Sequence, residues 1–96
     1  MTEQDRLLML KTDLGFTSTA YDSRLKQILT SSTAAIIAEG ASTLDDTQLA
    51  DAELIVMYAA WIWRRRDTGE GMPRMLRWSL NNRIFAEKAR GEVVND

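Results

Sequence analysis

Apolar residues recur along most of the chain at the three- and four-residue spacing that places them on one face of an α-helix. The first such stretch lies between Thr2, a good N-cap residue with an acidic side chain three positions later, and Gly15, which favours helix termination. A second stretch lies between Thr19, followed by Asp22 at the same offset, and Gly40. The pattern therefore predicts a short first helix and a longer amphipathic second helix.

A third helix is predicted for residues 47–66, with Asp45 or Asp46 as its N-cap. It contains the apolar run 54–63, which ends at three consecutive arginines. Because a helix turns by about 100° per residue, both of its sides are apolar. One side carries Leu54, Tyr58 and Trp61, and the other carries Ala52, Val56, Ala59 and Trp63. A chain of 96 residues has little room to bury such a helix, so we expect neighbouring subunits to complete its burial.

A fourth helix is predicted from Pro73, a favoured first-turn residue, to about Gly91. It has two apolar stripes on nearly opposite sides. One consists of Leu76, Leu80 and Ile84, and the other of Trp78, Phe85 and Ala89. The first stripe is expected to face the subunit's own core. The second is left for a partner, since aromatic side chains with arginine nearby are favoured at the centres of protein interfaces.

Together these elements predict an all-α fold of about four helices, with a long apolar third helix and a fourth helix that follows a glycine-containing loop. No long stretch alternates between apolar and polar residues as a strand does. The loop, residues 67–72, is either a plain surface loop or a segment that becomes ordered on a partner. We expect a single helical domain over residues 1–91 and a short polar C-terminal tail over residues 92–96.

Composition excludes much enzyme chemistry. The chain has no cysteine and no histidine, which removes thiolate and imidazole metal ligands and the commonest general base. No carboxylates are spaced for acid–base chemistry, and no phosphate-binding glycine loop is present. We therefore expect no enzyme and no catalytic, cofactor or metal site. The apolar run is about half the roughly 20 residues of a membrane-spanning helix, and the N-terminus is polar, so a cytoplasmic protein is expected.

Charge is unevenly distributed, although the net charge is only −2. Residues 1–63 carry four basic and nine acidic side chains, whereas residues 64–96 carry eight basic and five acidic ones. The basic half can bind nucleic acid, or it can meet the acidic half of a neighbouring subunit. We favour the second for the arginines at 64–66, with acceptors on a neighbouring subunit. Plausible acceptors are Asp45, Asp46, Asp51 and Glu53.

Three sequence blocks occur in a distinctive order. They are "LLMLKTDLGF", "TAYDSRLKQILTSSTAAI" and "DAELIVMYAAWIWRRRDTGEGMPRMLRWSLNNRIFAEKAR". In this order the chain resembles the small head-tail connector (adaptor) proteins of tailed bacteriophages and prophages. The resemblance covers most of the chain. Its specific part is "MPRMLR" at 72–77 together with "LNNR" at 80–83, whereas the leucines of the first helix are generic.

The resemblance implies a structural role in virion assembly and DNA packaging. Such connectors form a ring of about a dozen copies that docks on the portal protein and extends the DNA channel toward a tail-side connector or stopper. DNA would pass through without sequence-specific binding, and no membrane would be involved. The protein would lie in the bacterial host cytoplasm during assembly and at the head-tail junction of the virion. A ring needs two different contact faces per subunit, which agrees with helices that are apolar on two sides.

The candidate residues for a subunit or partner interface are the large aromatic and basic side chains of the last two predicted helices. They are Trp61, Trp63, Arg64, Arg65, Arg66, Arg74, Arg77, Trp78 and Phe85. The alternative is a small helical nucleic-acid-binding module that uses the arginine-rich C-terminal half, which the acidic first half opposes. Salt separates the two, because phosphate binding weakens steeply as salt increases.

Overall fold

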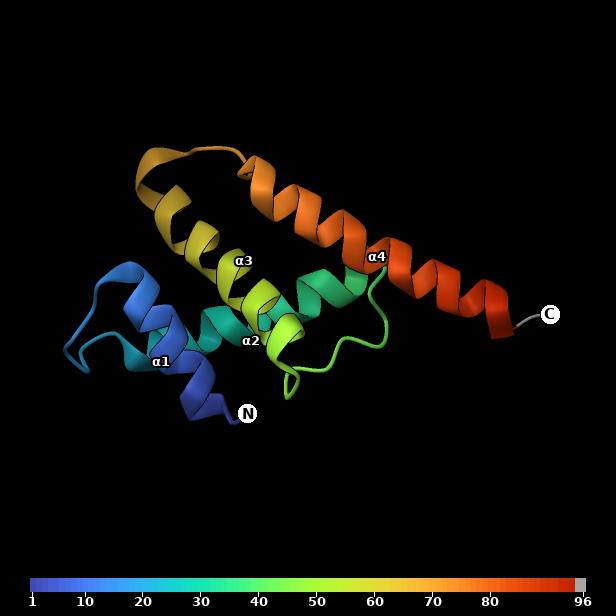
Figure 1. Cartoon of the computed structure of the whole chain (residues 1–96). Coiled ribbons are helices and arrows are strands. Elements are labelled where there is room, and N and C mark those ends of the chain that lie inside the picture. Colours follow the sequence, from blue (N-terminus) through green and yellow to red (C-terminus); the bar gives the residue numbers. More distant parts are fainter. Residues whose placement is uncertain (95–96) are drawn as a thin grey trace.

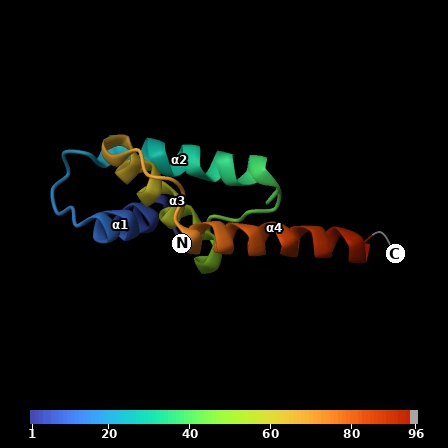
Figure 2. The ribbon, with the colours of Figure 1, turned by 90° about the horizontal axis from the view of Figure 1, so that it is seen from above.

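The computed structural model describes the backbone of residues 1–94 and the side chains of residues 1–89. Over this part the chain forms four helices and no strand, which confirms the all-α class. The helices are α1 (Glu3–Leu14), α2 (Asp22–Glu39), α3 (Leu49–Thr68) and α4 (Arg74–Val94). Figure 1 shows α1 and α4 on opposite sides of α3. Seen from above, α1 and α4 lie in one layer and α2 in another, and α3 crosses from one layer to the other (Figure 2).

The ends of α1 follow the sequence prediction. The hydroxyl of Thr2 accepts a hydrogen bond from the Asp5 backbone N–H, and the Asp5 carboxylate accepts one from the Thr2 N–H, at 3.2 and 2.9 Å. This reciprocal capping box satisfies two N–H groups that have no partner within the helix. At the other end Gly15 has a left-handed backbone (φ 77°), which terminates α1.

The predicted cap of α2 is wrong. Thr19 does not cap the helix, because α2 begins after Tyr21, which makes no side-chain capping hydrogen bond. The carboxylate of Asp22 instead lies 2.9 Å from the Lys11 ammonium of α1. A tertiary ion pair between two helices has replaced the local capping pattern.

The predicted caps of α3 are also wrong. The helix begins after Gln48, whose side chain makes no capping hydrogen bond. Asp45 instead accepts hydrogen bonds from the backbone N–H and the hydroxyl of Thr47, at 3.0 and 2.6 Å, and so closes a turn before the helix. At its other end α3 extends to Thr68, two residues beyond the predicted boundary.

The fourth helix starts at Arg74, one residue after the predicted first position Pro73, and ends later than predicted. The N–H of Arg77 donates to the carbonyl of Pro73 at 3.0 Å, which makes the first helical hydrogen bond. The helix does not stop near Gly91, and residues 92–94, which the sequence predicts to be part of the polar tail, are helical. Residues 95–96 of that predicted tail lie outside the described part of the chain.

Most of both apolar sides of α3 is buried within one subunit, so only part of the helix is left for neighbours to cover. Leu54 and Trp61 on one side and Val56 and Ala59 on the other are buried, whereas Tyr58 and Trp63 are partly buried. The physical reason is that α1, α2 and α4 all pack against α3, and its alanines let them approach closely. The buried residues of α3 are Ala52, Leu54, Ile55, Val56, Ala59, Ala60 and Trp61.

The end of α2 lies against α4 at a single glycine. Gly40 has φ 135°, a conformation that side chains with a Cβ rarely adopt. A Cβ at this position would lie 3.2 Å from Cγ2 of Ile84. Gly40 therefore ends α2 and also leaves room for α4.

Candidate interaction surfaces

One face of α4 is apolar and exposed, and we call it the outer face of α4. It consists of Met75, Trp78 and Phe85, which are 66%, 60% and 72% exposed. Leu76 and Leu80, on the opposite side of the helix, are fully buried. The prediction that one stripe of α4 faces the core is therefore confirmed, and the other stripe lies on the surface of the subunit. Neighbouring exposed apolar side chains of this size are typical of protein interaction sites.

Basic side chains border the outer face. Arg74 and Lys88 are exposed on the same side of the helix as Trp78 by helical spacing. Arg77 lies slightly further round and pairs with Glu39 of α2 at 3.5 Å. The border makes this face both apolar and positively charged.

A polar network fixes α4 to the rest of the subunit. The guanidinium of Arg83 donates to Asp51 of α3, with Nε 2.9 Å from Oδ1, and to Glu87 one turn further along α4, with Nη1 3.2 Å from Oε2. Glu87 also accepts hydrogen bonds from Ser42 and Thr43 in the loop between α2 and α3. Arg83 and Glu87 of α4 thus join this helix to α3 and to the loop between α2 and α3.

The network perturbs the ionisation of its members. Hydrogen bonds from Ser42 and Thr43, and then from Arg83, lower the pKa of Glu87 from 4.5 to about 2. Hydrogen bonding to Asp51, with a further contribution from Glu87, raises the pKa of Arg83. Both groups are therefore held in their charged forms. The arrangement has the character of a structural ion-pair network, since both acids are occupied by donors of the protein itself.

An aromatic cluster at the C-terminal end of α3 contains one of the predicted interface tryptophans. The ring of Trp63 lies 5.3 Å from that of Phe16 and 5.5 Å from that of Tyr21, measured between centroids. The guanidinium of Arg66 lies 4.2 Å from the centre of the Trp63 ring, in a cation–π contact. Trp63 is half-buried and holds the loop between α1 and α2 against α3.

Trp61 is part of the core rather than of the surface. Only 9% of it is exposed, and it packs edge-on against Tyr58 at 5.4 Å. Its ring N–H donates to the Glu70 carbonyl at 3.3 Å, and the Arg65 guanidinium lies 4.7 Å from the ring centre. Trp61 therefore anchors the loop that leads into α4.

Several other predicted contact residues also have partners inside the subunit. Arg64 donates to the Asp13 carbonyl at 3.3 Å. Two of the acceptors expected to bind arginines of a neighbour are used differently: Asp46 pairs with Arg6 at 3.3 Å, and Asp51 pairs with Arg83. Arg64, Arg65 and Arg66 stay exposed at the end of α3 but have partners in their own subunit, so the outer face of α4 is the exposed apolar part of the predicted interface.

A second apolar surface was missed by the sequence analysis, and we call it the α1–α3 groove. It has a volume of about 530 Å³ and is lined by Leu8, Met9, Thr12, Asp13, Glu53, Val56 and Met57. Leu8 is 63% exposed at its rim. The sequence gives only a weak indication of it, because Leu8 lies beside Leu7 and two positions before Leu10, and local spacing does not show which of these leucines stays exposed.

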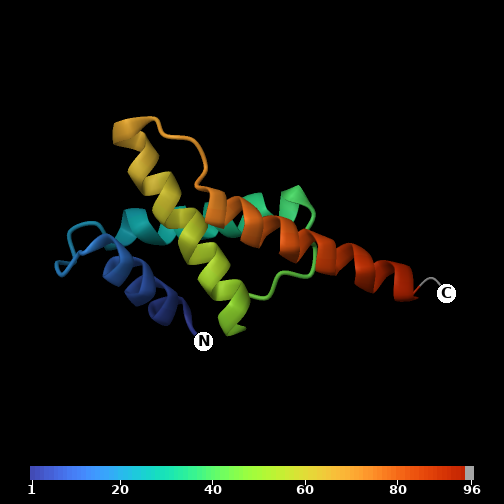
Figure 3. The same cartoon turned by 45° about the horizontal axis from the view of Figure 1, so that its top comes forward.

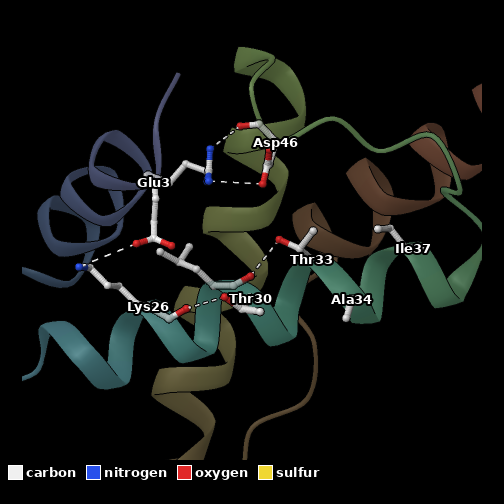
Figure 4. Close-up of a pocket in the computed structure, with 9 residues that line it drawn as sticks. Glu3, Lys26, Thr30, Thr33, Ala34, Ile37 and Asp46 are labelled. Carbon is white, nitrogen blue, oxygen red and sulfur yellow. Dashed lines mark hydrogen bonds and ion pairs between the residues drawn. The ribbon is translucent and has the colours of Figure 1, made fainter.

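Another groove lies between α1, α2 and Asp46 (Figure 4). Its charged residues pair with one another: Lys26 lies 3.8 Å from Glu3, and Arg6 binds Asp46. The hydroxyls of Thr30 and Thr33 donate to carbonyls of α2 itself. The Lys26–Glu3 pair links α2 to α1, and the Arg6–Asp46 pair links α1 to the loop before α3, so these polar groups are used within the subunit.

Neither metal-binding nor membrane-spanning elements are found in the described part of the chain. Over this part, no three acidic side chains gather as cation ligands would, and each helix is too short or too polar to span a bilayer. Comparison of the sequence with protein-family models and curated proteins, and of the fold with solved structures, gives no match. Inference about function therefore rests on the exposed surfaces of the subunit.

Proposed function

We propose that this protein is a structural assembly subunit, a head-tail connector of a tailed bacteriophage or prophage that forms a ring on the portal. The observation that carries the proposal is the outer face of α4, where Trp78 and Phe85 are exposed directly opposite the buried Leu80. Burying a side chain of this size contributes about 1.5–3 kcal/mol, so a partner that covers both would be bound strongly.

The position of this face also suits repeated assembly. The outer face of α4 and the α1–α3 groove lie on different helices, and Figure 3 shows α1 and α4 on opposite sides of α3. A subunit with two distinct surfaces can contact two neighbours at once. Contacts of that kind close into a ring when the rotation between subunits allows it.

The alternative, a nucleic-acid-binding module, has less support from the arrangement of the arginines. Arg65 and Arg66 stack on tryptophans, and Arg64 donates to a backbone carbonyl. These arginines therefore stabilise the end of α3. Basic residues of α4 are spread along the helix beside an apolar stripe, which favours a protein partner over a phosphate backbone.

Native mass spectrometry of the purified chain over a wide concentration range tests the proposal, with the portal protein added in a second series. A closed species of about a dozen copies, alone or on the portal, is the expected result. Duplex DNA binding in about 50 mM and 200 mM salt is measured in parallel. Tight binding at low salt that falls by orders of magnitude, with no closed oligomer in either series, would replace the connector with the nucleic-acid-binding module.

A further inference from the structure

We infer that the outer face of α4 in one copy of this chain occupies the α1–α3 groove of a second copy, in a head-to-tail contact. The inference rests on the proposed function, since it names the two surfaces through which a ring would form. Its occupant is a second copy of the chain, and the argument for that occupant is the complementarity of the two surfaces.

The apolar parts of the two surfaces match. The outer face of α4 offers a ridge of large side chains, Trp78 and Phe85. The α1–α3 groove offers a hollow whose lining includes Val56 and Met57, with Leu8 exposed at its rim. Methionine has an adaptable side chain that packs against irregular aromatic surfaces. A ridge from one copy and a groove from another can therefore exclude water together, whereas each alone leaves apolar surface in water.

The charges of the two surfaces are opposite. The groove is lined by two exposed carboxylates, Asp13 and Glu53. The ridge is bordered by the exposed cations Arg74 and Lys88. A head-to-tail contact brings these signs together, whereas a symmetric contact between two α4 ridges would bring like charges together. The charge pattern therefore favours a different surface on the neighbour over a copy of the same one.

The two surfaces share no residue, although Met75 at the edge of the outer face lies near Asp13 and Met57 of the groove. In the described part of the chain Trp78 and Phe85 line no pocket with the groove residues, so one subunit can use the ridge and the groove at the same time. Because the contact is between unlike surfaces, each added copy presents a free groove or a free ridge to the next. Such an assembly grows as a chain until it closes. The polar network at Arg83 keeps the orientation of α4 relative to α3 fixed, as a closed ring of defined size requires.

Cross-linking of single-cysteine variants tests the contact, because the chain has no cysteine of its own. Thr12→Cys places a thiol at the groove, and Asn81→Cys places one on the exposed side of α4, one helical turn from both Trp78 and Phe85. With a short bis-maleimide, the equimolar mixture is expected to give covalent dimers that contain one copy of each variant. Neither variant alone is expected to give them. Self-cross-linking of Asn81→Cys would reveal an α4–α4 contact and overturn the inference.

Substitutions give an independent readout of the same contact. Phe85→Ala is expected to raise the concentration of half-assembly about tenfold or more. Glu53→Lys is expected to weaken assembly, and Arg74→Glu on the neighbouring copy is expected to restore it by re-forming a pair of opposite charges. Leu49→Ala removes another exposed apolar side chain, which lies outside both surfaces, and is the matched control. It should change the concentration of half-assembly by less than about twofold. Equal effects of Phe85→Ala and Leu49→Ala would contradict the assignment.

The double variant Thr12→Cys with Asn81→Cys separates this inference from the proposed function. A cross-linked ladder that ends at a closed species supports both. A ladder of open chains, with no closed species alone or on the portal, supports the contact and rejects the connector. The contact between these two surfaces is rejected if the wild type forms rings but the double variant gives no cross-link. It is also rejected if the chain stays monomeric at millimolar concentration. A ring formed on the portal would then still support the connector.

Discussion

The guanidinium of Arg83 binds the carboxylate of Asp51 through two atoms, with Nε 2.9 Å from Oδ1 and Nη2 3.4 Å from Oδ2. Both side chains are largely buried, at 16% and 14% exposed. Asp51 lies in the first turn of α3 and Arg83 near the middle of α4, so this pair fixes how α4 crosses the subunit. The direction of the outer face of α4 depends on it.

Replacement of Arg83 by methionine is expected to lower the free energy of unfolding by about 1.5–3 kcal/mol, because Asp51 and Glu87 lose a charged donor. Arg83→Lys should recover only part of this loss, since an ammonium cannot make the two-atom contact. Urea denaturation followed by circular dichroism measures the effect. Arg24→Ala, at an exposed arginine of α2, is the control. A loss no larger than that of the control would show that the network does not stabilise the fold.

Stability is expected to fall with acidity because of Glu87. Its pKa is about 2 in the folded chain, against 4.5 for an unperturbed glutamate, so folding favours its ionised form. The stabilisation is fully present above pH 4.5 and is lost as the pH falls to about 2. Glu87→Gln should make the free energy of unfolding less dependent on pH in this window. Asp5 and Asp45, whose pKa values are lowered too, should leave part of the slope.

A wild-type protein whose urea midpoint is unchanged between pH 4.5 and 2 would contradict this account of Glu87. The carboxylate would then be as easily protonated in the folded chain as in the unfolded one. Glu70→Gln, at an exposed loop position, is the matched control and should keep the slope of the wild type.

Gly40→Ala is expected to destabilise the fold by about 1–3 kcal/mol, because alanine is strained at φ 135° and its Cβ would press on Ile84. Combination with Ile84→Ala separates the two causes, because alanine lacks both γ carbons that a Cβ at position 40 would meet. The loss caused by Gly40→Ala should be smaller in the Ile84→Ala background than in the wild type, and the strain should remain. Thermal unfolding followed by circular dichroism measures both variants. Gly71→Ala, where a Cβ meets open space, is the control. A Gly40→Ala chain as stable as this control would refute the close approach of α4.

The two faces of α4 should respond differently to truncation. Leu80→Ala is expected to cost about 2–5 kcal/mol of unfolding free energy, because Leu80 is fully buried against the core. Phe85→Ala should change the stability of the isolated subunit by no more than about 0.5 kcal/mol, because its ring lies in solvent. Denaturation at a concentration where the wild type is monomeric makes the comparison. Equal losses would mean that Phe85 serves the fold of the subunit.

The existence and order of the helices could be read from the sequence because local spacing reports them directly. Thr2 and Gly15 mark the ends of α1 as expected, since a cap is a contact between near neighbours. Thr19 does not cap α2, and Asp22 instead pairs with the distant Lys11. Asp45 does not cap α3, because its carboxylate accepts a hydrogen bond from Thr47 instead. Local patterns therefore predicted where helices form better than how they begin.

The interaction surfaces were only half predictable. Trp78 and Phe85 stood out because they lie opposite Leu76 and Leu80 on one helix, which is a property of spacing alone. The groove beside Leu8 requires α1 and α3 to lie together, and no local pattern contains that information. Trp61 and Trp63 look like interface residues in sequence, yet the packing of the subunit uses them internally.

By itself the sequence determined that the chain is helical, where its four helices lie, and that α4 has two apolar sides. These properties follow from the period of the helix and from residues a few positions apart. Only the tertiary structure decided that most apolar residues of α3 are buried by its own subunit, that Arg83 joins Asp51, and which apolar surfaces stay exposed. The physical reason is that burial depends on which helices meet in space, and this is set by the summed packing of side chains far apart along the chain.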